Sequence, residues 1–213
     1  RGIRQAALLT FGFCAVVSTV VIAFANLFGA GGAPLFSMAR GRGDDDEARR
    51  IMGNVFSMLA GTGLLLTALV LLFKRPLLYL FGASDVTYPY ADAYITIYLC
   101  GSVFVMLGLG MNNFINAQGF ARKGMMTVLI GAALNIALDP LFIFVFDMGV
   151  RGAALATVLS QFVSALWAVG FLCGRRTLLR LEPRWMRVQL PVVGRITALG
   201  FSSFIMAITN SAV

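Results

Sequence analysis

The sequence contains no histidine and few charged residues. Asp, Glu, Lys and Arg make up 12% of its 213 residues, hydrophobic residues make up 59%, and the mean hydropathy is +0.87. Few soluble domains have such a composition. The absence of histidine argues against a Ser-His nucleophile pair, and no second intramembrane acid is visible that could complete a carboxylate dyad. We therefore predict a membrane protein that is not an enzyme and has no cofactor.

Cysteine is also scarce. Cys14, Cys100 and Cys173 each lie in or at the end of an apolar segment, without Cys-x-x-Cys spacing and without a histidine to complete a metal site. We interpret them as small packing residues. A cleavable signal peptide is not evident, because the first apolar run is too long for one. The membrane segments themselves are expected to direct the chain to the plasma membrane as a multi-pass protein.

Apolar stretches long enough to cross a bilayer recur along the chain, and each crossing needs roughly 20 mostly apolar residues. Only helices or closed barrels satisfy the backbone inside a bilayer, so these stretches predict an all-α membrane protein, a polytopic helical bundle. The six stretches lie near 5–36, 51–73, 90–114, 125–146, 153–173 and 196–213.

The net charge of +8 could indicate a nucleic-acid partner, but the placement of the basic residues favours a lipid bilayer as the partner. If alternate loops share a compartment, five basic residues fall on one side and twelve on the other, and the richer side is cytoplasmic by the positive-inside rule. We predict no nucleic-acid partner. The twelve are Arg40, Arg42, Arg49, Arg50, Arg122, Lys123, Arg175, Arg176, Arg180, Arg184, Arg187 and Arg195.

Several polar or helix-breaking segments predict where the helices end. Glycines at 29, 31 and 32 and Pro34 are expected to interrupt the first stretch before a loop at 39–50, and Pro76 to end the second stretch. Asp44 and Glu47 have capping-box spacing and predict a helix start. The acids at 44–47 could bind a divalent cation, but beside four arginines we interpret them as a solvated loop without a site.

The last loop, residues 174–195, contains Arg184, Trp185 and Arg187 among apolar residues. It is expected to lie along the inner membrane interface. The sequence favours charge that sets topology over specific recognition of anionic lipids.

Asp139 is the most informative residue, because it is an acid inside an apolar stretch, where ionisable groups usually belong to an ion or substrate pathway. Asn135 lies one helical turn before it and shares its face. Pro140 has no N–H and leaves the carbonyl of Ile136 free. Burial favours the neutral acid and a nearby cation favours the charged form, so protons, sodium ions and cationic drugs could compete for one carboxylate. The alternative is a structural hydrogen bond between helices.

The runs that begin at Gly32, Asn112, Asn135 and Gly152, namely GAPLFSMARGRGD, NNFINAQG, NIALDPLFI and GAALATV, together resemble the multidrug and toxic compound extrusion (MATE) family, near its MepA-like subgroup. The resemblance implies a parent protein of twelve helices in two lobes. It places residues 1–174 in the first lobe, 175–195 in a cytoplasmic inter-lobe loop and 196–213 in the first helix of the second lobe. The chain, which opens on Arg1, is expected to be an internal fragment; oligomeric state is not predicted.

The resemblance also implies a function: an antiporter that exports cationic lipophilic drugs in exchange for protons or sodium ions. Thr157 resembles the family's ion-site threonine, which gives a predicted cation site of Asn135, Asp139 and Thr157, with sodium at Asp139 as the possible metal ion. Thr157 could instead bond its own helix backbone. Asn112 and Asn116 share a face and could line a drug cavity or join helices, although the family often has arginine at position 116.

A lipid or polysaccharide-precursor flippase of the same superfamily is the alternative function, and a purely structural membrane protein is a third.

Overall fold

The computed structural model describes residues 2–80 and 88–212, and within them every regular element is helical. Six helices are long and apolar enough to cross a bilayer, which confirms the all-α fold and the predicted spans. They are α1 (Gly2–Gly41), α2 (Asp45–Leu80), α3 (Tyr88–Ala117), α4 (Ala121–Pro140), α5 (Gly149–Cys173) and α6 (Leu190–Ala212). A π-helical turn, η1 (Leu141–Val145), follows α4, and a 3-10 turn, η2 (Pro183–Trp185), precedes α6.

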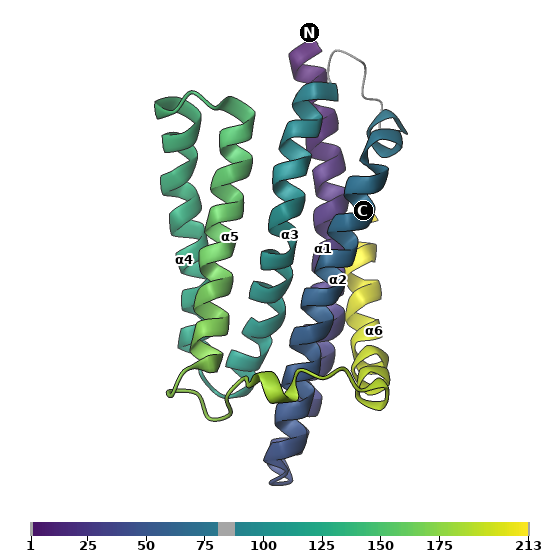
Figure 1. The fold of residues 1–213 in the computed structure, drawn as a ribbon, viewed down its shortest axis with the longest axis vertical. Coiled ribbons are helices and arrows are strands. Elements are labelled where there is room, and N and C mark those ends of the chain that lie inside the picture. The colour runs from purple at the N-terminus through teal and green to yellow at the C-terminus, as the bar shows by residue number, and fades with distance from the viewer. Residues whose placement is uncertain (1, 81–87, 213) are drawn as a thin grey trace.

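The six helices lie side by side along one common direction (Figure 1). Helix α1 packs on α2, α3 and α6, and α3 also packs on α5. Helices α4 and α5 form a hairpin at one side of the bundle, while α6 lies at the other side (Figure 1). The segment 174–189, here called the linker, therefore crosses beneath the bundle to join α5 to α6 (Figure 1).

Helix α1 is not interrupted by its glycines and Pro34, so the predicted break before residue 39 is wrong. The glycines serve helix contacts instead. A Cβ atom at Gly31 would overlap the carbonyl oxygen of Ile196 in α6, and one at Gly29 would lie 2.8 Å from the Cα atom of Gly110 in α3. Small residues let transmembrane backbones approach in this way. Neighbouring elements also compensate for the hydrogen bond that a proline removes from a membrane helix.

Helix α2 begins where the capping pattern predicts. The amide of Glu47 donates to Oδ1 of Asp44 at 2.9 Å, which satisfies one free donor of the first turn. The Glu47 side chain does not complete a capping box and instead forms ion pairs with Arg195 at 2.8 Å and Arg42 at 3.6 Å. At its other end α2 continues through Pro76 to Leu80, so the predicted end at Pro76 is also wrong.

The linker is fixed to the bundle by two buried amide side chains. Oε1 of Gln118 accepts hydrogen bonds from the hydroxyl of Thr177 (2.6 Å) and the amides of Leu178 (2.9 Å) and Leu179 (3.1 Å). Oδ1 of Asn54 accepts the amide of Gln189 at 2.7 Å. Helix α6 starts directly afterwards, so the loop is six residues shorter than the predicted 174–195, and the helix assigned to 196–213 starts at Leu190.

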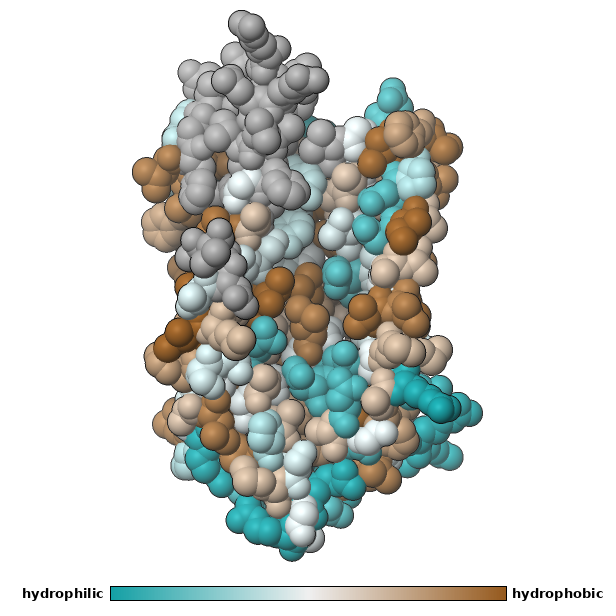
Figure 2. All heavy atoms as spheres, turned by 180° about the vertical axis from the view of Figure 1, so that it is seen from behind, coloured by the Kyte–Doolittle hydropathy of each residue, from teal (hydrophilic) through white to brown (hydrophobic). Residues whose placement is uncertain are grey.

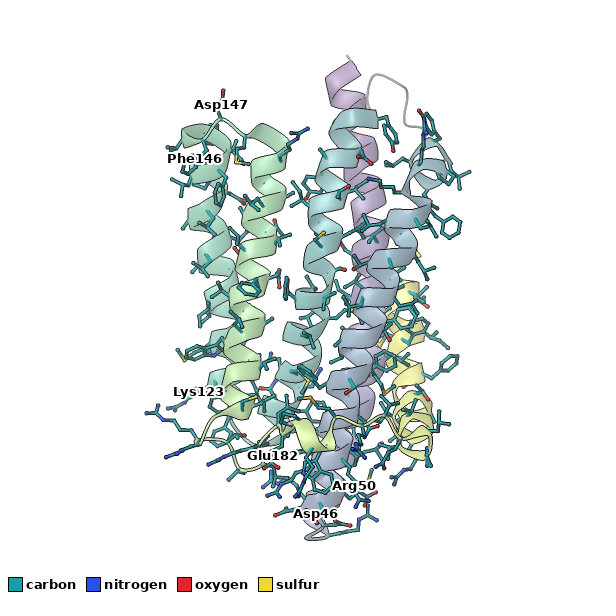
Figure 3. The ribbon with its side chains drawn as sticks, viewed as in Figure 1. Asp46, Arg50, Lys123, Phe146, Asp147 and Glu182 are labelled. Atoms are coloured by element: carbon teal, nitrogen blue, oxygen red, sulfur yellow. The ribbon has the colours of Figure 1, made fainter. Side chains whose placement is uncertain are left out.

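The basic residues of the linker and of the adjoining helix ends gather at one end of the bundle, as predicted. Figure 3 shows Arg50 and Lys123 at this end, together with Asp46 and Glu182, whereas Asp147 lies at the opposite end. The bundle thus has one strongly basic end, here called the linker end. Its assignment to the cytoplasm remains a prediction of the positive-inside rule.

Two of the three cysteines do not pack in the interior. Cys100 and Cys173 are free thiols on exposed positions, so their interpretation as packing residues is wrong. The side chain of Cys14 lies outside the described residues.

Substitution of Gly200 by alanine should destabilise the bundle, because its Cβ atom would overlap the backbone carbonyl of Leu27 and backbone cannot move aside as a side chain can. We expect a cost of about 1–3 kcal/mol, typical of overpacking. Gly194 in the same helix is surrounded by open space, so Gly194→Ala is the matched control. The melting temperature in detergent should fall for Gly200→Ala alone; equal behaviour of the two variants would contradict the close α1–α6 contact.

Cysteine labelling tests the orientation. In a background without the native cysteines, an impermeant thiol reagent applied to intact cells should label Asp147→Cys and spare Asp46→Cys and Arg180→Cys, since all three positions are exposed and the last two lie at the linker end. Strong outside labelling at position 46 or 180 would invert the topology.

Candidate functional site

The backbone changes from α to π geometry beside Asp139. Helix α4 ends at Pro140, and the next turn, η1, has the wider π hydrogen bonding. Proline cannot donate a backbone hydrogen bond, so the helix loses a bond to the preceding turn at this point. Such π turns occur frequently at functional sites. Asp139 lies closer to the Val145 end of its span than to the Ala121 end, rather than at the middle of the membrane.

The three predicted cation-site residues lie together. Nδ2 of Asn135 donates to Oδ1 of Asp139 at 3.5 Å and to Oγ1 of Thr157 at 3.4 Å. Asn135 and Asp139 come from consecutive turns of α4, as their spacing predicts, and Thr157 comes from α5. Both distances exceed the usual range of about 2.7–3.2 Å for N–H···O bonds. The cluster is therefore formed but not tightly closed.

The Thr157 hydroxyl bonds its own helix backbone, as one of its two interpretations predicts, and also contacts Asn135. Its Oγ1 donates to the carbonyl of Ala153 in its own helix at 3.0 Å and accepts from Asn135. The backbone bond fixes the hydroxyl hydrogen away from the cluster, so the oxygen lone pairs face Asn135. This is the orientation that a cation ligand requires.

The chemistry of the cluster depends on the Asn135 amide. In the observed arrangement its N–H groups occupy the space between the Asp139 carboxylate and the Thr157 oxygen. Rotation of the amide by half a turn would exchange its nitrogen for its oxygen and present a third hard oxygen ligand. The cluster can thus be closed by its own amide or opened toward a cation.

A cleft of about 240 Å³, lined by both polar and apolar residues, begins at this cluster and runs between α3, α4 and α5. Asn135 and Thr157 line it, whereas Asp139 does not. Figure 2 shows polar residues along the furrow between the α4–α5 hairpin and the rest of the bundle. The other polar residues that line the cleft are Asn112, Thr127, Ser160, Gln161 and Ser164.

The structure separates the two asparagines predicted for a substrate cavity. Asn112 lines the cleft, and its Oδ1 is buried without a hydrogen-bond partner among the described residues. Asn116 is exposed and does not line it. Both amide oxygens occupy the space that a Cβ atom at Gly124 would need, so they pack α3 against α4. Asn112 fits both interpretations and Asn116 only the structural one.

The sequence contains a signal for the rest of the cleft that the predicted site does not use. Thr157, Ser160, Gln161 and Ser164 follow the spacing i, i+3, i+4, i+7, which places four polar side chains on one face of α5. All three hydroxyls donate to backbone carbonyls: Thr157 and Ser160 within α5, the latter to Ala156 at 2.7 Å, and Ser164 across to Thr127 in α4 at 2.8 Å.

Comparison with known proteins gives consistent matches. Residues 3–141 match the MatE family model. The multidrug export protein MepA of Staphylococcus saprophyticus is 27% identical over 194 residues, which are 90% of this chain and 43% of that protein. The chain therefore spans less than half the length of this curated relative.

Two solved structures of a multidrug resistance MATE family transporter of the MOP superfamily have the same arrangement of helices. The inward-facing one has a TM-score of 0.89 at 25% identity and covers 99% of this chain and 48% of its own. The outward-facing one has a TM-score of 0.85 at 25% identity, with 96% and 45% covered. The part of the transporter that this chain resembles keeps its fold in both conformations.

Proposed function

The chain belongs to the MatE family, and from this premise we propose that it forms part of a multidrug exporter in which export is coupled to the entry of protons or sodium ions. The observation that carries the proposal is the cluster of Asn135, Asp139 and Thr157 at the end of the cleft. An acid inside an apolar helix is costly and usually serves transport. The six membrane spans supply the setting that such a role requires.

Coupling follows from competition for the carboxylate. A proton or sodium ion at Asp139 and a cationic drug near it cannot both be favoured, because each neutralises the same charge. Asn135 links this carboxylate to the cleft, since it contacts Asp139 and also lines the cleft. Binding of the cation at Asp139 and binding of the drug in the cleft would then exclude one another, and the Asn135 side chain would connect the two sites.

The lining of the cleft supports a cationic lipophilic cargo. Among its described lining residues there is no lysine or arginine, and apolar groups of Leu109, Val128 and Ala132 alternate with the polar ones. A flippase for anionic lipid or polysaccharide precursors would need basic residues facing its cargo. We therefore prefer drug export to the flippase alternative.

Substitution of Asp139 by asparagine in the complete protein should abolish coupled export and leave expression unchanged, because the amide keeps the shape of the side chain and removes the titratable charge. Drug accumulation in cells carrying the variant is the measurement. Asp147→Asn is the matched control, since this acid is exposed at the α4–α5 turn. Unchanged efflux in Asp139→Asn would remove the residue from the mechanism.

Alanine at Asn135 or Thr157 should weaken the dependence of transport on sodium or pH several-fold while the melting temperature changes little, because each variant loses a ligand and the hydrogen bonds removed from the cluster are long, 3.4 and 3.5 Å. Transport into proteoliposomes, measured across a sodium series and a pH series, provides the readout. Ser160→Ala is the control, since its hydroxyl lines the cleft but bonds only its own helix. If Ser160→Ala shifted the cation dependence as much, the three residues would not form one site.

A further inference from the structure

The first part of the linker, residues 176–181, has one side buried against the bundle and one side exposed. Thr177, Leu179 and Leu181 are buried against the bundle, each with at most 8% of its surface exposed. The alternating residues Arg176, Leu178 and Arg180 are exposed. The exposed side of the segment is therefore basic, with one apolar residue between two arginines.

Gln118 holds this segment in place. Its side chain is 4% exposed and receives three hydrogen bonds at Oε1 from the segment, while its Nε2 donates to the carbonyl of Leu179 at 3.3 Å. The amide of Leu181 also donates to the carbonyl of Leu172 in α5 at 2.9 Å. Charges that only set topology need no such support, because topology depends on their number and side. Here the backbone that carries the arginines is fixed.

Further basic residues lie beside the segment. The ring of Phe120 packs on that of Phe171, with centroids 5.3 Å apart, and this contact brings the first turn of α4 next to the end of α5. We call the resulting surface the basic strip. It consists of Arg122, Lys123, Arg175, Arg176, Leu178 and Arg180.

No ion pair within the described part of the chain neutralises the charges of the basic strip. Ion pairs among the described residues involve Arg42, Arg49, Lys74 and Arg195, and none involves a residue of the strip. Glu182 is the only acid between Asp147 and the end of the printed sequence. The strip also lies at headgroup depth, because Arg175 follows the span that ends at Cys173 and Lys123 lies in the first turn of the span that begins at Ala121.

We propose that the basic strip binds the phosphate headgroups of anionic phospholipids in the leaflet at the linker end. The guanidinium groups of Arg176 and Arg180 would pair with the phosphates, and Leu178 between them would enter the upper acyl region. A soluble polyanion could use the arginines but not the exposed leucine, which is why a lipid fits this surface best. The strip lies on the side of the bundle away from α6 (Figure 1).

Two double variants of the complete protein test this. Arg176→Gln with Arg180→Gln removes two charges from the strip, and Arg42→Gln with Arg49→Gln removes two ion-paired charges from the same end. In nanodiscs of phosphatidylcholine with phosphatidylglycerol, native mass spectrometry should show phosphatidylglycerol affinity roughly twenty-fold weaker for the first variant, since each basic residue at an anionic surface contributes about five-fold. The control should stay within about two-fold of the unchanged protein. Equal losses in both variants, or no loss in either, would overturn the proposal.

Gln118→Ala tests whether lipid binding requires a fixed backbone at the basic strip or only its positive charge. It leaves every charge in place and removes the anchor of the segment, so phosphatidylglycerol retention should fall several-fold while the melting temperature in pure phosphatidylcholine remains measurable. Unchanged retention in a folded Gln118→Ala variant would show that the anchored segment plays no part. If inorganic phosphate at constant ionic strength raised the melting temperature of the protein as much as phosphatidylglycerol does, the lipid assignment would be wrong. Should Gln118→Ala fail to fold, the paired double variants still decide the question.

Discussion

No water is available inside a bilayer to satisfy a backbone amide or carbonyl group, and the rest of this structure depends on that constraint. It explains why α1 and α2 continue through Pro34 and Pro76, where a soluble helix would more often end. It also gives meaning to the different outcome at Pro140, where the helix changes to a π turn. Among the prolines inside the described membrane helices, Pro140 is the one at which the helix type changes, and it lies beside the intramembrane acid.

The same constraint requires polar side chains inside the bundle to find hydrogen-bond partners within the protein. In most of the bundle they have close partners: the hydroxyls of Thr67 and Ser102 lie 2.9 Å apart, and Lys74 lies 2.7 Å from Asp92. In the cleft, Oδ1 of Asn112 has no hydrogen-bond partner among the described residues, as is also true of buried nitrogens of Arg49, Trp167 and Trp185, and the bonds of Asn135 are long. Buried polar groups are normally satisfied, so the amide groups of the cleft could gain hydrogen bonds from an external ligand.

Sequence reasoning predicted the features that depend on local spacing. The six spans, the start of α2 at the Asp44 cap and the common face of Asn135 and Asp139 all follow from periodicities that any helix imposes. Its prediction that glycines interrupt the first membrane helix was wrong. Gly31 predicted a break because its isolated propensity is poor, but its role is a close contact with α6, some 165 residues further along the chain. The role of Gln118 was unpredictable for the same reason, because its partners lie 59 to 61 residues away.

Helices α5 and α6 are neighbours in sequence and distant in the bundle, so non-helical backbone must cross between them at the membrane surface (Figure 1). Such backbone still needs hydrogen-bond partners where it is buried against protein. Gln118 and Asn54 supply them near the two ends of the linker. Thr177, Leu179 and Leu181 are buried where the linker is held, and Arg176, Leu178 and Arg180 are left exposed. The requirement that makes the spans helical therefore also fixes the orientation of the basic strip.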